Sequence, residues 1–97
     1  MVDVSLHSGA EVDYEVSLAW YLERSAEAGA RFEAAVESAM AAIAARPDLY
    51  PFIDDQHRFL RLRRFPFYVV YRGDTQSVRV VAIAHARRMT GYWTQRS

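Results

Sequence analysis

The sequence predicts an α+β fold in which two helices pack on a small, mostly antiparallel four-stranded sheet. Three observations support this prediction: an alternating stretch at the N-terminus, two consecutive helical patterns up to residue 46, and three strand patterns within residues 58–85. Strands joined by short turns form antiparallel meanders, and a helical pair with an apolar side must cover one face of their sheet. The predicted order is β-α-α-β-β-β, in a single domain over residues 1–97.

The N-terminal elements are a short strand and a helix. Residues 2–7 alternate apolar and polar side chains, which is the period of a half-buried strand. Ser8 and Glu11 fit a capping box and predict a helix over about residues 9–24. One side of this helix is expected to face the sheet, with residues at positions i, i+4, i+7 and i+11, and Leu18, Trp20 and Leu22 widen that apolar side. The residues at those positions are Val12, Val16, Ala19 and Glu23.

A second helix follows a weak break at Ser25 and Gly29. It should end at Arg46, because Pro47 disfavours helical geometry in the residue before it. Its apolar face consists of Phe32, Val36, Ala39, Met40 and Ile43. Residues 48–55 contain proline and aspartate at turn positions, so they form a loop.

The remaining chain contains three strand patterns. Residues 58–64 alternate, and Pro66 ends the first strand because it cannot donate a ladder hydrogen bond. Leu60 and Leu62 share one face of it, and Phe59, Arg61 and Arg63 share the other. Residues 67–72 and 78–85 flank a turn and complete the meander. The expected core contains Val12, Val16, Phe32, Val36, Met40, Ile43, Val69, Val81 and Ile83.

Charge divides the chain into two halves. Residues 1–55 carry eleven acidic and three basic residues, whereas residues 56–97 carry nine basic and one acidic residue. All twelve basic residues are arginine, which binds carboxylates and phosphates through a bidentate fork. Either the C-terminal half faces an anionic partner, or the two halves pack together and neutralise each other.

The composition also excludes several classes of site. With no cysteine, the chain forms neither disulfides nor a cysteine-based zinc site, and its three histidines lack ligand spacing. We therefore expect no metal and no cofactor. No apolar run approaches the ~18–20 residues that span a bilayer. No basic stretch precedes an apolar one at the N-terminus, so a cytoplasmic location is expected.

Several motifs together resemble the RelE/ParE toxin superfamily, and its ParE-like branch in particular. After the helical pair come a Pro-Asp-Leu-Tyr-Pro loop, the sequence RFPFYVVYR at residues 64–72, and a strand ending in AHARR. Tyr92 and Trp93 follow. The resemblance covers nearly the whole chain, although Thr90 stands where ParE-like sequences often carry proline.

The resemblance implies the toxin of a type II toxin-antitoxin module, of the kind linked to growth inhibition and plasmid stabilization. A cognate antitoxin would neutralise it and would provide the only contact with operator DNA. The resemblance to the ParE-like branch implies that the target is DNA gyrase and that the toxin acts without catalysing a reaction. Two alternatives remain: a ribosome-dependent mRNA endoribonuclease of RelE type, or a non-toxic partner in assembly and autoregulation.

Catalytic residues are assigned only under the endoribonuclease alternative. His85 would act as base or acid, Arg61 or Arg88 (or Arg63) would clamp the phosphate, and Tyr92 would stack or act as acid. The favoured interpretation of His85 is structural: it ends a core strand on the same face as Val81 and Ile83, with its ring hydrogen-bonded nearby.

Binding candidates are the exposed arginines and aromatic residues. Arg87 and Arg88 are adjacent and should point to opposite faces if the chain is extended there. Tyr92 and Trp93 are expected to pack back on the sheet, or else to anchor a partner. On the first helix, Tyr14, Trp20 and Tyr21 cannot all face the core, so part of this set should be exposed. The candidates for target or antitoxin binding are Arg61, Arg63, Arg87, Arg88, Tyr92, Trp93, Trp20 and Tyr21.

Overall fold

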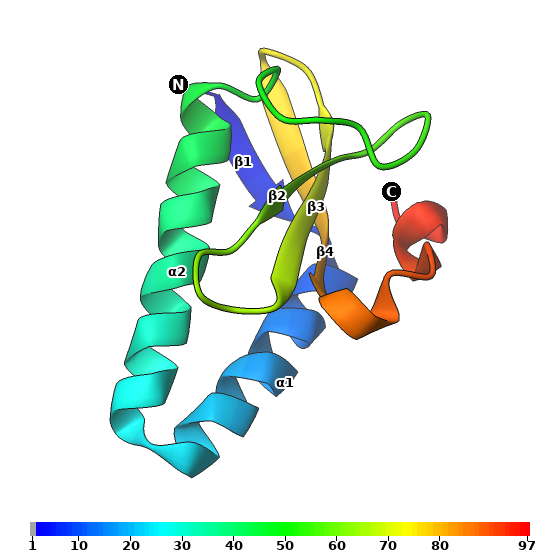
Figure 1. Cartoon of the computed structure of the whole chain (residues 1–97). Coiled ribbons are helices and arrows are strands. Elements are labelled where there is room, and N and C mark those ends of the chain that lie inside the picture. Colours follow the sequence, from blue (N-terminus) through cyan, green and yellow to red (C-terminus); the bar gives the residue numbers. More distant parts are fainter. Residues whose placement is uncertain (1) are drawn as a thin grey trace.

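The computed structural model describes residues 2–97 and confirms the predicted order of elements (Figure 1). The strands are β1 (Asp3–Leu6), β2 (Arg58–Arg61), β3 (Phe67–Gly73) and β4 (Ser77–His85), and the helices are α1 (Ser8–Arg24) and α2 (Ala26–Ala45). Two 3-10 helices, η1 (Ala86–Arg88) and η2 (Tyr92–Gln95), form the C-terminal tail. Within the described chain, no helix combines the length and apolarity needed to cross a membrane.

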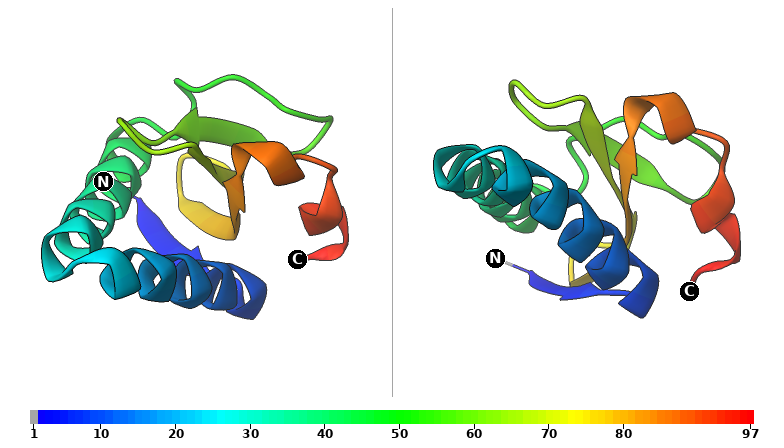
Figure 2. Two further views of the ribbon diagram at one scale, coloured as in Figure 1. Left: turned by 60° about the horizontal axis from the view of Figure 1, so that its bottom comes forward. Right: turned by 90° about the horizontal axis from the view of Figure 1, so that it is seen from below.

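The four strands form one mixed sheet with the order β1-β4-β3-β2. β1 runs parallel to β4, whereas β2, β3 and β4 pair antiparallel, as expected for a meander. The helices cover one face of the sheet, and the C-terminal tail lies against the other (Figure 2). The sheet therefore has a buried layer on each side, which explains the long apolar run in β4.

Helix α1 packs against the sheet through a different stripe from the predicted one. Val12 is 57% exposed and Val16 is 66% exposed, so their assignment to the core was wrong. The inward side instead carries Ala10, Tyr14, Leu18 and Tyr21. The two tyrosines stack on Phe32, with ring centroids 6.0 and 5.0 Å from it. Aromatic packing favours this rotation of the helix over burial of the two valines.

The start of α1 also differs from the prediction. Its N-cap is His7, whose ring Nδ1 accepts a hydrogen bond of 2.9 Å from the Gly9 N–H. Ser8 is already helical, so the predicted capping box with Glu11 does not form. The cap is a ring nitrogen and not the expected Ser8 hydroxyl, because β1 ends at Leu6, one residue earlier than predicted. His7 keeps an extended backbone and so stands just outside the helix.

The second helix and its core face agree with the prediction. Phe32, Val36, Ala39 and Ile43 are buried, and Met40 is half-buried against the same cluster. The helix ends at Ala45, one residue before the predicted end, with Arg46 as its C-cap. Pro47 therefore acts as the stop that its backbone geometry requires.

A bulge in β4 corrects the expected placement of its side chains. The register with β3 shifts at Val70 and Tyr71, which pair with Ala82 and Val80 and leave Val81 as the extra residue. Ile83 consequently lies on the helix side of the sheet, whereas Val81 lies in the cluster on the opposite side. The prediction that these two residues share a face was wrong, because simple alternation has no place for an extra residue.

Candidate functional site

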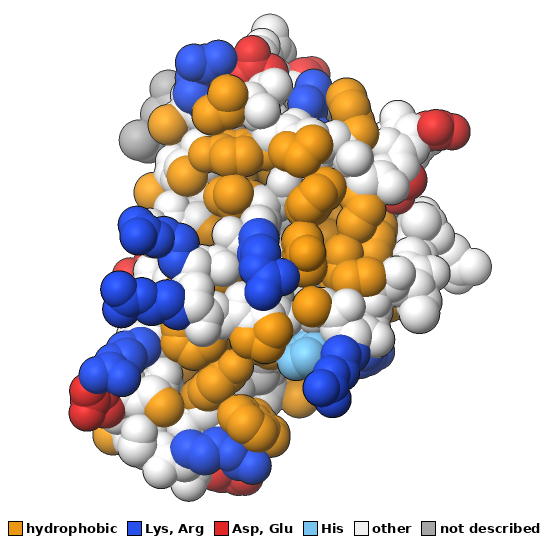
Figure 3. Space-filling view, viewed as in Figure 1, with side chains coloured by type: hydrophobic (Ala, Val, Ile, Leu, Met, Phe, Trp, Pro, Cys, Tyr) orange, Lys and Arg blue, Asp and Glu red, His pale blue; other side chains and the backbone are white. Residues whose placement is uncertain are grey.

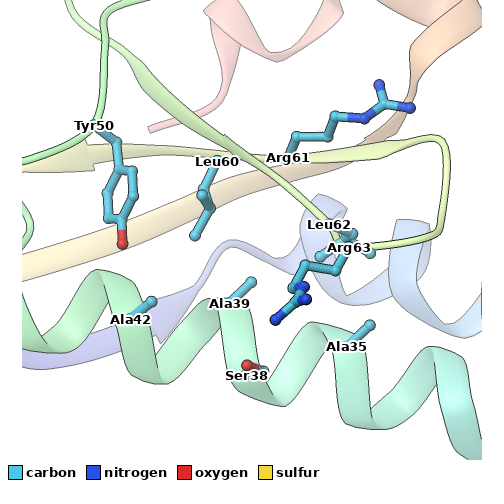
Figure 4. Close-up of a pocket in the computed structure, with 9 residues that line it drawn as sticks. All are labelled: Ala35, Ser38, Ala39, Ala42, Tyr50, Leu60, Arg61, Leu62 and Arg63. Carbon is cyan, nitrogen blue, oxygen red and sulfur yellow. The ribbon is translucent and has the colours of Figure 1, made fainter.

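The first candidate surface is a groove between α2 and β2 (Figure 4). Small side chains of α2 form its floor, Leu60 of β2 and Leu62 just after that strand form the opposite wall, and Tyr50 lies at one end. Its volume is about 230 Å³. We call it the α2 groove, and its lining residues are Ala35, Ser38, Ala39, Ala42, Tyr50, Leu60, Arg61, Leu62 and Arg63.

Arg61 and Arg63 point in different directions at this groove. Arg61 extends away from α2, and its Nη1 donates a 3.3 Å hydrogen bond to the Tyr68 hydroxyl. Arg63 points toward α2 (Figure 4). The prediction placed both arginines on one strand face, but β2 ends at Arg61 and its alternation stops there. Of the two, Arg63 therefore offers its charge to a ligand in the groove.

A second, more basic cavity continues the α2 groove. It shares Ala35 and Arg63 with the groove, has a volume of about 540 Å³, and contains three guanidiniums, those of Arg31, Arg63 and Arg64. We call it the arginine pocket. Arg31 pairs with Glu27, but no carboxylate within the described chain lies within ion-pair distance of Arg63 or Arg64. The groove thus runs from an apolar end to a cationic end.

Arg64 occupies a strained backbone conformation. Its φ is +68°, and it is the only non-glycine residue with positive φ in the described chain. A side chain in this left-handed region costs about 1–2 kcal/mol, which asparagine or glycine would reduce. An arginine held there places its charge at the exposed turn between β2 and β3. Arg64 was not among the predicted binding residues, because backbone strain leaves no mark in a sequence pattern.

The third candidate surface lies between α1 and the ends of β3 and β4. We call it the α1 pocket; its volume is about 480 Å³. An adjoining cavity of about 270 Å³ extends it along α1 toward the C-terminal tail and shares Val16, Phe67, His85 and Arg88 with it. The pocket itself is lined by Val16, Ser17, Trp20, Tyr21, Pro66, Phe67, His85 and Arg88.

His85 is held by local contacts in this pocket. Its Nδ1 accepts a 3.0 Å hydrogen bond from the Arg87 N–H, and its ring packs edge-on against Phe67 at 5.0 Å. The expectation that a nearby backbone group binds the ring is confirmed. Because Nδ1 accepts this hydrogen bond, the neutral ring carries its own proton on Nε2.

Arg87 and Arg88 lie within the 3-10 helix η1, so the chain is not extended there and the condition for opposite faces does not hold. Arg87 is exposed. Arg88 reaches into the α1 pocket, and its guanidinium lies 5.0 Å from the centre of the Tyr92 ring. The tight turn of η1 thus separates the two arginines and gives only Arg88 a place beside His85.

The two tail aromatics pack back on the molecule, as expected. Trp93 is only 2% exposed, and its Nε1 donates a 3.3 Å hydrogen bond to Asp54. Tyr92 is half-buried and donates a 3.2 Å hydrogen bond from its hydroxyl to Asp13. Burial and the Asp13 charge raise the pKa of Tyr92 to about 12, so its hydroxyl stays protonated at neutral pH. Trp93 is therefore a structural residue.

The residues assigned under the endoribonuclease alternative come together only in part. His85, Arg88 and Tyr92 line the same cavity, but Arg61 lies on β2, outside it. The aromatic residues of α1 also separate: Tyr21 packs on Phe32, Phe65 and Phe67, whereas Trp20 is 51% exposed. The prediction that part of the α1 aromatic set is exposed is confirmed. Among the described residues, no cluster of side chains is suited to hold a metal ion.

Figure 3 shows one face of the molecule, on which hydrophobic side chains extend almost from end to end. Arginines lie among them and along the left and lower margins, while acidic side chains stay at the periphery. An apolar surface with cationic groups and few anionic ones suits a partner that is itself apolar and acidic.

Comparison with known proteins agrees with this picture. The family model described as the ParE toxin of the type II toxin-antitoxin system parDE matches residues 4–90. The chain belongs to this ParE toxin family. It is thus a toxin of the type II toxin-antitoxin class, as its motifs predicted.

The fold of this ParE-family chain also resembles a solved structure, described as the chromosomal ParDE toxin-antitoxin system from P. aeruginosa. The TM-score is 0.62 at 16% sequence identity, and the match covers 88% of this chain and 96% of that chain. No curated protein matches the sequence. This likeness, at low sequence identity, is one of fold.

Two carboxylates that fix the tail of this ParE-family chain were missed by the sequence analysis. Asp13 binds Tyr92 and Arg96, and Asp54 binds Trp93 and His57. Asp13 was interpreted only as a favourable charge near a helix N-terminus, and Asp54 only as a turn residue. Their partners lie 39 to 83 residues away in sequence, apart from His57, so no local pattern indicates the tail contacts.

Proposed function

We propose that this chain inhibits DNA gyrase, and so blocks replication, by binding rather than by catalysis, and that a cognate antitoxin neutralises it. The antitoxin segment would occupy the α2 groove with its apolar side chains and place carboxylates in the arginine pocket. The observation that carries the proposal is the change along this surface from alanines and leucines to unpaired guanidiniums. The gyrase target follows from the resemblance to ParE-like toxins.

The shape of the α2 groove favours an extended or helical peptide segment. The floor of the groove and of the adjoining arginine pocket consists mostly of alanines, which let a partner backbone approach closely, and it runs along α2 from Ala42 in the groove to Ala28 in the pocket. At 1.5 Å per residue this stretch of α2 is about 21 Å long. A peptide helix of about four turns would cover it. One end of that peptide should be apolar, and the other should carry acidic residues facing Arg63 and Arg64.

The geometry around His85 supports a non-enzymatic mechanism. RNA cleavage needs a base, a cation and an acid around one phosphate. The neutral His85 ring has its Nδ1 lone pair engaged by the Arg87 N–H, and burial holds the Tyr92 pKa at about 12. The His85 Nε2–H and the protonated Tyr92 hydroxyl could each donate a proton, but the cavity then offers no unengaged base to accept one.

The antitoxin part of the proposal is tested by charge reversal in the arginine pocket. Arg63→Glu should weaken binding of the cognate antitoxin by about tenfold or more, because a carboxylate would then face the partner's carboxylates. Arg79→Glu is the matched control, since Arg79 lies on β4 beside β1 and lines neither the groove nor the pocket. Equal dissociation constants for the two variants, measured by calorimetry, would contradict the proposed site.

The target part is tested with purified enzyme. The wild-type chain should cause DNA gyrase to accumulate covalent DNA-cleavage complexes, and added antitoxin should abolish them. The second candidate function, mRNA cleavage on the ribosome, is favoured by one observation, the gathering of His85, Arg88 and Tyr92 around one cavity. Cleavage of ribosome-bound mRNA with no effect on gyrase would replace the first candidate with the second. We also expect operator DNA to bind the complex but not the toxin alone.

A further inference from the structure

The outer side of helix α1 carries three large apolar side chains that the fold leaves exposed. Val12, Val16 and Trp20 are 57%, 66% and 51% exposed and recur every four residues, so they form one stripe. Burial of such side chains against a partner stabilises the complex because it removes apolar surface from water. Exposed apolar groups arranged in a row mark an interaction site more often than isolated ones do.

This stripe borders the α1 pocket, which provides a place for a side chain of a partner. The walls of the pocket are mostly apolar and include Tyr21, Pro66 and Phe67, and no acidic residue lines it. Its cationic group is Arg88, whose guanidinium has no carboxylate within ion-pair distance in the described chain. The pocket therefore joins a large apolar cavity to one available guanidinium.

The chemistry of the walls decides between a nucleic acid and a protein as the occupant. Specific recognition of a flipped-out base requires hydrogen-bonding groups aimed at its edge. Apart from Arg88, the lining offers only the Ser17 hydroxyl, the Tyr21 hydroxyl and the His85 ring. A cavity of about 480 Å³ with such walls suits a large apolar side chain, and a carboxylate beside it would pair with Arg88.

We propose that the α1 pocket and the stripe of Val12, Val16 and Trp20 form the target-binding surface of this toxin. They accept a protein segment that inserts one large apolar side chain and pairs an adjacent carboxylate with Arg88. This inference rests on the proposed function, because it assigns the target and the antitoxin to different surfaces. The α1 pocket shares no lining residue with the α2 groove and only Tyr21 with the arginine pocket, so substitutions at its other residues separate the two interactions.

The test uses three exposed substitutions in the full chain: Val16→Glu, Trp20→Ala and Arg88→Glu. Leu49→Ala is the matched control, because Leu49 is also 57% exposed but lines neither surface. Circular dichroism and thermal melting confirm folding. Each variant is then measured for growth inhibition on induction, for cleavage complexes with purified gyrase, and for affinity toward the antitoxin.

We expect the three variants to lose growth inhibition and to need about tenfold or more protein for the same amount of cleavage complex, with unchanged antitoxin affinity. Retained growth inhibition would overturn the inference. A parallel loss of antitoxin affinity would also overturn it, because the pocket would then belong to the antitoxin. If even the wild type has no effect on gyrase, the gyrase proposal fails by itself. The growth measurement then still decides whether the α1 pocket binds the toxin's target.

Discussion

Asp13 on helix α1 and Arg96 near the C-terminus form a largely buried ion pair, with 2.9 Å between Oδ2 and Nη1. The pair lies beside β4 just beyond the point where β1 stops pairing with it, at Val80. Asp13 accepts a hydrogen bond from the Ile83 N–H, and Arg96 donates one to the Val81 carbonyl. These two side chains thus provide hydrogen-bond partners for backbone groups on the edge of β4 where no neighbouring strand does so.

Removing the Asp13 carboxylate should be costly for this reason. We expect Asp13→Ala to lower the free energy of unfolding by about 3 kcal/mol, because Arg96, the Tyr92 hydroxyl and the Ile83 N–H all lose their acceptor. Glu27→Ala removes the exposed ion pair with Arg31 and should cost less than about 1 kcal/mol. Urea unfolding measures both. Similar losses for the two variants would show that the Asp13 network adds little.

The pH dependence of stability should show the environment of Asp54. Burial by itself would raise its pKa, but hydrogen bonds from Gln56, His57 and Trp93 outweigh this and lower the pKa from 3.8 to about 2. Since the folded pKa is depressed, the stabilisation is complete above about pH 4 and is lost as the pH falls toward 2.

Asp54→Asn should therefore be less stable than the wild type at pH 6, by on the order of 2 kcal/mol, and the two should converge near pH 2. The measurement is urea unfolding at several pH values between 6 and 2. Asp55→Asn, at the exposed neighbouring position, is the control and should follow the wild type. A constant difference between Asp54→Asn and the wild type across this range would disprove the prediction.

The turn between β3 and β4 should tolerate no side chain at Gly73. Its φ is +138°, and an added Cβ would collide with the Ser77 carbonyl oxygen and lie 2.8 Å from the Val78 Cα. We expect Gly73→Ala to cost more than about 2 kcal/mol, because backbone atoms cannot move aside. Gly91 has a φ of +81° but open space, with its nearest contact 3.7 Å away, so Gly91→Ala should cost about 1 kcal/mol. Thermal unfolding should rank the two in this order.

The rate of association with the antitoxin should fall with salt concentration mainly because of the arginines at the α2 groove. Arg61→Ala/Arg63→Ala should flatten the dependence of the association rate on ionic strength, because these charges lie at the α2 groove. Arg87→Ala/Arg88→Ala, at the other end of the molecule, should follow the wild type. Stopped-flow rates between low and molar salt give both slopes. Parallel curves for all three proteins would leave these arginines without a role in antitoxin recruitment.

His85→Ala should retain more growth inhibition than Arg87→Ala/Arg88→Ala. The His85 ring serves mainly to hold the start of η1 through the Arg87 N–H, whereas Arg88 offers an unpaired charge in the α1 pocket. Induced growth curves of both variants, with folding checked by circular dichroism, test this ranking. Complete loss of toxicity in a folded His85→Ala protein would instead support the endoribonuclease alternative.

Most of the fold follows from local patterns in the sequence. The α2 stripe, the Pro47 stop and the three-stranded meander are each encoded within a few neighbouring residues, and the structure confirms them. Helix α1 is different because it has two competing stripes, one aliphatic and one with two tyrosines. Only the rings that α2 and β3 place opposite it, those of Phe32 and Phe67, decide in favour of the tyrosines.

The candidate site was less predictable, because it depends on contacts between distant segments. The sequence identified Arg63, Arg88 and Trp20 as binding candidates, but it gave no means to assign them to separate surfaces. It also did not indicate Arg64, whose exposure depends on a strained turn.

The bulge at Val81 determines which side of the sheet receives the end of β4. If the same residues formed a regular strand with no bulge, alternation from Val78 and Val80 would place Ala82 and Ala84 toward the helices and turn His85 toward the tail. Deleting Val81 would remove the irregularity and leave the other side chains where they are, because Ala82 would then follow Val80 on the tail side and Ile83 would stay on the helix side. The α1 pocket thus depends on two successive residues, Val81 and Ala82, facing the tail side, because this brings Ile83 and His85 back to the helix side.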